Sequence, residues 1–229
     1  MTFKPSLPFD ISKKNWNDDN LFPSEMYLDT NLALMLVLRQ PNFYKVEEFL
    51  KEYAIVRGNN VFWSVLTESE LFECIHVDTL KKKSAQFGYQ PAKWKDMENE
   101  LDQKNFSTIN NESDARFTSA IHVLKQYGDV LDDLDSTNQP NSRIIIKENA
   151  RKIYTTHGGG IKDAEHIAIA NEYGINNILT NDSNNGNGFF RYPQQNIYGI
   201  SKFIADGYTP NIKANEYKDL IREEDPSES

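Results

Sequence analysis

Apolar residues recur along this chain in two alternating patterns. Short apolar runs rich in β-branched and aromatic residues predict buried strands at 26–29, 61–66, 176–180 and 196–200. Apolar residues at helical spacing predict helices over the following ranges: 31–38, 43–54, 68–83, 92–103, 113–134, 143–155, 162–173 and 215–223. Strands that alternate with helices are typical of a parallel sheet with helices on both faces. The sequence therefore predicts the α/β class, with three α/β/α layers around a central parallel sheet.

The predicted elements form one domain, 25–212, between an N-terminal arm, 1–24, and a C-terminal helix with an acidic tail, 213–229. The arm is rich in proline, asparagine and aspartate, so we expect irregular chain there. From about 84 to 142 the sequence becomes polar and is broken by glycines and prolines, which favours a helical insertion. Because the chain must leave the domain and return to it, we expect this insertion beside the functional site, shaping substrate access or a dimer contact.

Composition narrows the function classes. No stretch approaches the ~20 apolar residues that a membrane span needs, and residues 1–14 lack the apolar core of a signal peptide, so we expect a cytoplasmic protein without a membrane partner. Cys74 is the only cysteine, which excludes an internal disulfide, and its apolar neighbours predict a core position. The net charge of −9 disfavours general attachment to nucleic acid, so RNA would have to meet a local basic patch.

Four acidic residues are placed where parallel sheets form sites. Asp29 and Asp182 each end a predicted strand, and Glu70 and Asp163 lie near the starts of predicted helices. Strand ends and helix starts meet at one edge of such a sheet, so we expect the four side chains to converge. Converging carboxylates repel one another, and a hard divalent cation such as Mg²⁺ or Mn²⁺ removes that repulsion.

These residues stand in four short motifs, in this order: Asp29-Thr30-Asn31, Glu70-Leu71, the helix from Asp163 to Ala170 (DAEHIAIA), and Thr180-Asn181-Asp182. Their order and settings resemble the PIN-domain family of metal-dependent ribonucleases, over about 25–75 and 160–205. The resemblance implies a PIN-like fold and a Mg²⁺- or Mn²⁺-dependent endoribonuclease that hydrolyses RNA phosphodiester bonds. It implies that the four acids are catalytic residues and metal ligands, and it is compatible with a toxin of a toxin–antitoxin pair, with an antitoxin or other protein partner, and with a homodimer.

Other polar residues have supporting roles in this hypothesis. Asn31, Thr180 and Asn181 offer neutral oxygens and hydrogen bonds that orient carboxylates, phosphate or water. Arg143, Lys147 and Arg151 recur at i, i+4 and i+8 on one helix face that could meet RNA phosphates, and the competing interpretation is a solvated charged face. His166, one turn after Asp163, is expected to be structural.

Each acid also has a purely local interpretation. Asp29 suits a helix cap, Glu70 a solvated helix face, Asp163 the positive end of a helix dipole, and Asp182 a turn. At the level of the protein, the alternative is a non-catalytic PIN-fold module that binds RNA or protein. A metal-dependent phosphatase of another α/β fold is disfavoured, because Asn31 stands where an Asp-x-Asp nucleophile motif needs its second aspartate.

Overall fold

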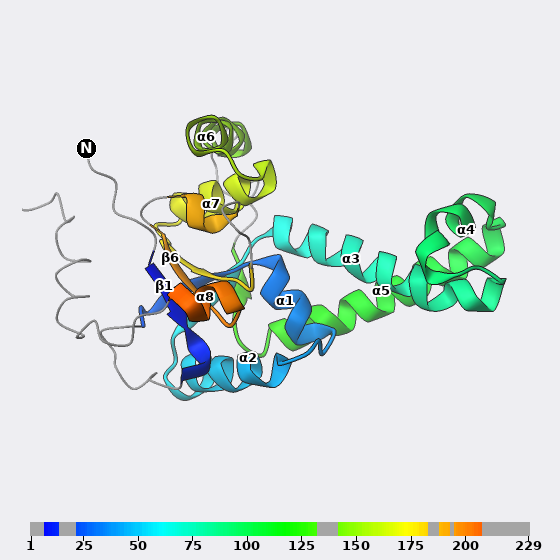
Figure 1. Cartoon of the computed structure of the whole chain (residues 1–229), viewed down its shortest axis with the longest axis horizontal. Helices are drawn as coiled ribbons and strands as arrows, with labels where there is room; N and C mark the ends of the chain where they lie inside the picture. The colour runs from blue at the N-terminus through cyan, green and yellow to red at the C-terminus, as the bar shows by residue number, and fades with distance from the viewer. Residues whose placement is uncertain (1–6, 14–21, 132–141, 183–187, 193–194, 208–229) are drawn as a thin grey trace, which may run out of the picture.

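Six parallel strands form one sheet at the centre of the molecule (Figure 1). The computed structural model describes residues 7–13, 22–131, 142–182, 188–192 and 195–207. The strand order is β1-β6-β5-β2-β3-β4. The strands are β1 (Leu7–Asp10), β2 (Glu25–Leu28), β3 (Asn60–Trp63), β4 (Asp129–Val130), β5 (Asn177–Leu179) and β6 (Asn196–Gly199). The predicted α/β class with a central parallel sheet is confirmed.

Helices cover both faces of the sheet, as the three-layer prediction requires. On one face lie α1 (Thr30–Val37) and α2 (Phe43–Leu50), which continues into the π-helical turn η2 (Lys51–Val56). On the other face lie α6 (Ser142–His157) and α7 (Ile161–Glu172). Each face has its own cluster of buried apolar side chains, and this burial is the main source of stability. The shorter helical segments are η1 (Ile11–Lys13), η5 (Phe189–Arg191) and α8 (Lys202–Gly207).

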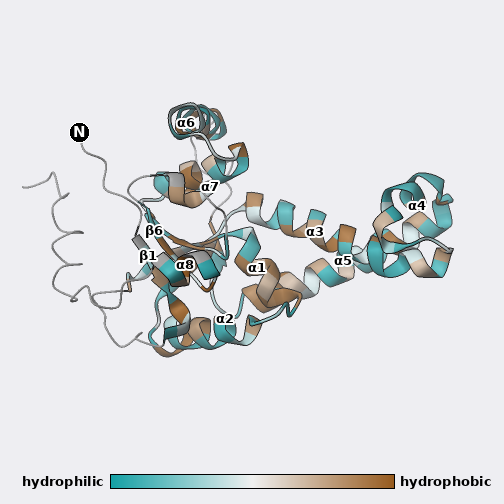
Figure 2. Cartoon of the chain, viewed as in Figure 1, coloured by the Kyte–Doolittle hydropathy of each residue, from teal (hydrophilic) through white to brown (hydrophobic). Residues whose placement is uncertain are grey.

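A long helical hairpin, hereafter the arm, projects from the sheet (Figure 1). It consists of α3 (Val65–Ser84), η3 (Ala85–Phe87), η4 (Pro91–Lys93), α4 (Trp94–Glu100) and α5 (Gln103–Leu124). Its far end has a small core of Leu80, Met97 and Ile109, and its surface there is largely hydrophilic (Figure 2). The hairpin holds together through packing and ion pairs between α3 and α5, such as Lys83 Nζ to Glu112 Oε2 at 2.6 Å.

The expectation that residues 1–24 form irregular chain is wrong for residues 7–10. These residues form β1, which pairs in parallel with β6 at the edge of the sheet. Phe9 stacks on Tyr198 with ring centroids 4.6 Å apart, so β1 is fixed by aromatic packing as well as by its ladder. Pro8 argued against a strand, but proline is tolerated on an edge strand.

The insertion also contributes to the sheet. The predicted helix 113–134 ends at Leu124, and β4 pairs with β3 at the other edge. Gly128 permits this approach, because a Cβ there would lie 1.9 Å from the Val61 carbonyl oxygen. The predicted strand 61–66 ends at Trp63, because the Ser64 hydroxyl accepts a hydrogen bond from the Thr67 amide and caps α3.

One further expectation is contradicted by the described residues, and another falls outside them. Cys74 is exposed on α3, so the prediction of a core cysteine is wrong. None of the helices in the described ranges is long and apolar enough to cross a membrane. The predicted helix 215–223 lies outside the described residues.

Candidate functional site

Asp29 lies directly after the central strand β2, and its carboxylate is buried. It caps α1, since Asp29 Oδ2 accepts a hydrogen bond from the Asn31 amide at 3.3 Å. The same oxygen accepts the Thr180 hydroxyl at 2.7 Å. The local capping role of Asp29 is therefore present, and it coexists with a buried setting and a partner from another strand end that a simple cap does not require.

Asp163 and Asp182 are brought together by glycines in two loops. Asp163 is in the first turn of α7, and Asp182 follows β5, where its amide donates to the Thr180 hydroxyl at 3.0 Å. A Cβ at Gly160 would lie 2.7 Å from Asp163 Oδ2, and a Cβ at Gly188 would lie 1.7 Å from Asp182 Oδ2. Only residues without a side chain leave room for both carboxylates.

The electrostatics of Asp163 indicate how close the three aspartates are. Burial, together with the negative charges of Asp29 and Asp182, raises the pKa of Asp163 to about 6, against an opposing effect of His166. Burial likewise raises the pKa of Asp29, despite its hydrogen bonds and His166 nearby. Carboxylates from three separate elements therefore share one electrostatic site at the carboxyl edge of the sheet.

Glu70 belongs to the same region but has a different environment. Burial would raise the pKa of Glu70, but hydrogen bonds from His166 and Thr30, with the nearby cations, lower it to about 2. Glu70 Oε2 accepts from the Thr30 hydroxyl at 2.7 Å and lies 3.1 Å from His166 Nε2. Glu70 Oε1 lies 3.0 Å from Lys162 Nζ. Both oxygens of Glu70 thus contact residues of the chain itself, so Thr30, His166 and Lys162 hold this carboxylate in place.

His166 is buried at the centre of a polar chain. Its Nδ1 lies 2.7 Å from the Tyr27 hydroxyl, which lies 2.6 Å from the Ser64 hydroxyl. Burial would lower the pKa of His166, but Tyr27, Glu70 and Asp29 together raise it. A protonated imidazole donates from both nitrogens, so Tyr27 accepts from His166 and donates onward to Ser64. His166 is thus a structural cation that connects the acidic site to the interior, as the sequence suggested.

Sequence reasoning missed three of these partners. Tyr27, Ser64 and Lys162 hold His166 and Glu70 in place, and none of them had been assigned a role. A weak signal existed for Tyr27, because its hydroxyl interrupts an otherwise apolar strand and must find a buried partner. Lys162 directly precedes Asp163, and no sequence pattern connected it with Glu70.

Two of the neutral residues predicted for the site, Asn31 and Asn181, line one hollow. A hollow of about 200 Å³ beside Asp182 is lined by Asn31, Leu34, Gln40 and Asn181. Asn181 Oδ1 is buried and has no hydrogen-bond partner in the described structure, so it is an oxygen that still needs a donor or a cation. Thr180 has the orienting position expected of it. Of the four acids, however, only Asp182 lines this hollow.

The basic stripe, formed by Arg143, Lys147 and Arg151 on α6, does not line the hollow beside Asp182. Arg143 and Lys147 line a separate crevice of about 240 Å³ against Leu131 and Ile169, and Arg151 is exposed on α6. This crevice contains Glu165 but none of the four site acids. The expectation that the stripe accompanies the acidic site therefore gains no support from the lining of that site.

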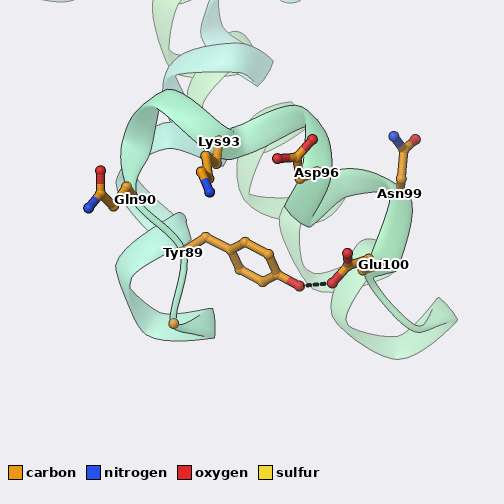
Figure 3. Close-up of a pocket in the computed structure, with 7 residues that line it drawn as sticks. Tyr89, Gln90, Lys93, Asp96, Asn99 and Glu100 are labelled. Atoms are coloured by element: carbon orange, nitrogen blue, oxygen red, sulfur yellow. Dashed lines mark hydrogen bonds between the residues drawn. The ribbon is translucent and has the colours of Figure 1, made fainter.

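A larger hollow, of about 480 Å³, is at the tip of the arm (Figure 3). Tyr89, Lys93, Asp96 and Glu100 line it, and the Tyr89 hydroxyl donates a hydrogen bond to Glu100. None of the four acids lies there. The acidic site contributes none of its lining residues.

The side chains of the candidate site have the right atoms for a hard cation, but they are not grouped as a metal site. Asp29, Asp163, Asp182 and Asn181 offer only oxygen atoms, which Mg²⁺ and Mn²⁺ prefer. Within the described residues, however, no three His, Cys, Asp or Glu side chains are grouped closely enough to hold a metal ion. The charges of Asp29 and Asp182 nevertheless contribute to the raised pKa of Asp163, so the three carboxylates interact electrostatically.

No model of a known protein family matches this chain, and no curated protein matches it.

Proposed function

We propose that this protein is a metal-dependent ribonuclease that hydrolyses RNA phosphodiester bonds at Asp29, Asp163 and Asp182. The observation that carries the proposal is the buried carboxylate of Asp29, which Thr180 links to the Asp182 strand end, beside an Asp163 whose pKa burial and the other two aspartates raise to about 6. Keeping three like charges together opposes folding, so such an arrangement suggests a ligand that offsets the repulsion. A divalent cation bound there supplies charge neutralisation for a phosphate and activates a water molecule.

The chain's own residues would divide the work as follows. Thr180 and the Asn31 amide hold Asp29 Oδ2, so that Asp29 presents its other oxygen in a fixed direction. Asn181 Oδ1 adds a neutral oxygen beside Asp182. The ion pair of Glu70 with Lys162, which belongs to α7, fixes α7 against α3 and thereby positions Asp163. In this arrangement Glu70 is a positioning residue and not a direct ligand.

Asp29→Asn tests the proposal. Asparagine caps helices about as well as aspartate, so the variant should fold with nearly unchanged stability. If Asp29 serves the reaction, cleavage of single-stranded RNA in Mg²⁺ or Mn²⁺ should fall by about 100-fold or more, because the cation is held less well. The thermal stabilisation that Mn²⁺ gives the wild type should also shrink.

The matched control is Asp114→Asn, which makes the same change at an exposed site on the arm and should behave as wild type. Undiminished cleavage and an unchanged Mn²⁺ response in Asp29→Asn would reduce Asp29 to a helix cap. Cleavage of a small phosphomonoester in place of RNA would favour the phosphatase.

One observation favours the non-catalytic alternative. Lys162 neutralises Glu70 from within the chain, as expected of an acid whose role is structural. A binding module with this architecture would bind RNA or protein without hydrolysis. It would show no metal-dependent cleavage in the assay above, and Asp29→Asn would leave its binding unchanged.

A further inference from the structure

A crevice of about 470 Å³ lies between the end of α1 and the helices α3 and α5 of the arm. Val37, Leu38 and Ile75 give it apolar lining, and α5 contributes the small residues Ala115, Ser119 and Ala120 beside Glu112 and Arg116. The lining residues are Val37, Leu38, Arg39, Ile75, Lys82, Glu112, Ala115, Arg116, Ser119, Ala120 and Val123. This volume lies within the range of ligand sites of proteins.

The rim of this crevice is positively charged on an otherwise acidic chain. Arg39, Lys82 and Arg116 line it, against the single acid Glu112. Lys83 pairs with Glu112 at 2.6 Å, and Asp78 is shared between Lys82 and Arg116, so cations outnumber acids around the opening. Arg39 lies over the Phe43 ring, 5.8 Å from its centroid, and forms no ion pair with any described residue. Its guanidinium donors remain available to a phosphate.

The crevice and the hollow beside Asp182 are both lined by residues of α1 and of the turn that follows it. Asn31 and Leu34 on this helix line the hollow beside Asp182, and Val37 and Leu38 at its end line the crevice. Of the next two residues, Arg39 lines the crevice and Gln40 lines the hollow. From Asn31 to Leu38 the helix rises by roughly 10 Å. A flexible polyanion extending from the acids along α1 therefore reaches the cations directly.

We propose that this crevice is a binding subsite for single-stranded RNA, which holds the substrate next to the acidic site. The inference rests on the ribonuclease function proposed above for the choice of ligand. Arg39 contacts a phosphate, and the apolar lining of the crevice receives a base. The arm thus forms one wall of the substrate path at its base, while its tip stays outside.

Two variants with different chemistry test the subsite. Arg39→Glu removes the cation, and Ala115→Phe fills the hollow without a change of charge. Binding of a fluorescent single-stranded RNA is measured by anisotropy in EDTA, so that no cleavage is needed for a signal. One lost phosphate contact reduces the salt dependence by ~0.7 in the log–log slope, which corresponds to about fivefold weaker binding at 0.1 M salt. Ala115→Phe should weaken binding with the slope retained.

Lys104→Glu is the control for Arg39→Glu, because it reverses one exposed charge on the arm outside the crevice. Loss of affinity in both crevice variants but not in the control supports the subsite, even if no metal-dependent cleavage is found, in which case only the nuclease proposal fails. Equal losses in Lys104→Glu, or none in either crevice variant of a protein that cleaves RNA, would overturn the subsite alone. A change of molecular mass by light scattering in Ala115→Phe, with RNA affinity unchanged, would overturn it in favour of a second copy of the chain as occupant.

Discussion

Asp163 offers a measurement of carboxylate repulsion that needs no substrate. Replacement by asparagine keeps the shape of the side chain and removes its charge. A pKa displaced from 3.8 to about 6 corresponds to roughly 3 kcal/mol. Because the Asp163 side chain is partly exposed, solvent screening reduces this to about 1 to 2 kcal/mol. We expect Asp163→Asn to be more stable than wild type by that amount at pH 7 without metal.

The pH dependence gives the sign of this difference in stability between Asp163→Asn and the wild type. Between about pH 4 and pH 6 folded Asp163 holds its proton more tightly than the unfolded chain does, so the wild type loses stability as pH rises through this window. Well below pH 3.8 the carboxyl is protonated in both states, and the wild type and the variant should be equally stable. The difference should therefore be small at pH 4 and reach its full value near pH 7.

Urea unfolding at constant m-value measures this difference, with Asp114→Asn as the control for a charge change on the arm. Saturating Mn²⁺ should reverse the order, since a ligand at 100 times its Kd adds about 2.7 kcal/mol to the wild type and less to the variant. An advantage of the variant that is equally large at pH 4 and pH 7 would refute the repulsion. So would a variant that is less stable than wild type at pH 7.

Further variants test the support around the site. Tyr27→Phe should lower the free energy of unfolding by about 1 to 3 kcal/mol, because its two buried partners lose a hydrogen bond, whereas Tyr44→Phe at an exposed site should be neutral in the same urea titration. Gly188→Ala should displace Asp182 and reduce the Mn²⁺ stabilisation seen by calorimetry. Its control is Gly58→Ala, where φ is also positive but nothing lies within 4 Å of the added Cβ. Equal Mn²⁺ responses in the two glycine variants would exclude the close contact with Asp182.

The sequence predicted the layers of the fold because the apolar periodicity is strong in the elements that cover the sheet. It failed at β1 and β4, which are edge strands of four and two residues. Such short strands have little periodicity of their own. They form because a partner strand is already in place, as the stacking of Phe9 on Tyr198 illustrates. Pairing of this kind is a tertiary effect that a local pattern does not contain.

The candidate site also has features that local patterns predict and features that depend on tertiary packing. Strand ends and helix starts led to the prediction that Asp29, Glu70, Asp163 and Asp182 converge, and the charges of Asp29 and Asp182 do influence the pKa of Asp163. The local patterns did not reveal that Glu70 would be held by Lys162 and His166, because that pairing depends on how α7 lies against α3. The rotation of one helix against another is set by side-chain packing and not by the pattern within either helix.

The most direct test of the metal-dependent site is a crystal structure of this protein soaked in Mn²⁺, with data collected at the manganese absorption edge. We expect one anomalous peak or a close pair at the carboxyl edge of the sheet, with oxygens of Asp29, Asp163 and Asp182 drawn in to about 2.0 to 2.2 Å. Glu70 should remain paired with Lys162. An acidic site without manganese, or manganese bound only at the tip of the arm beside Asp96 and Glu100, would contradict the proposed metal centre.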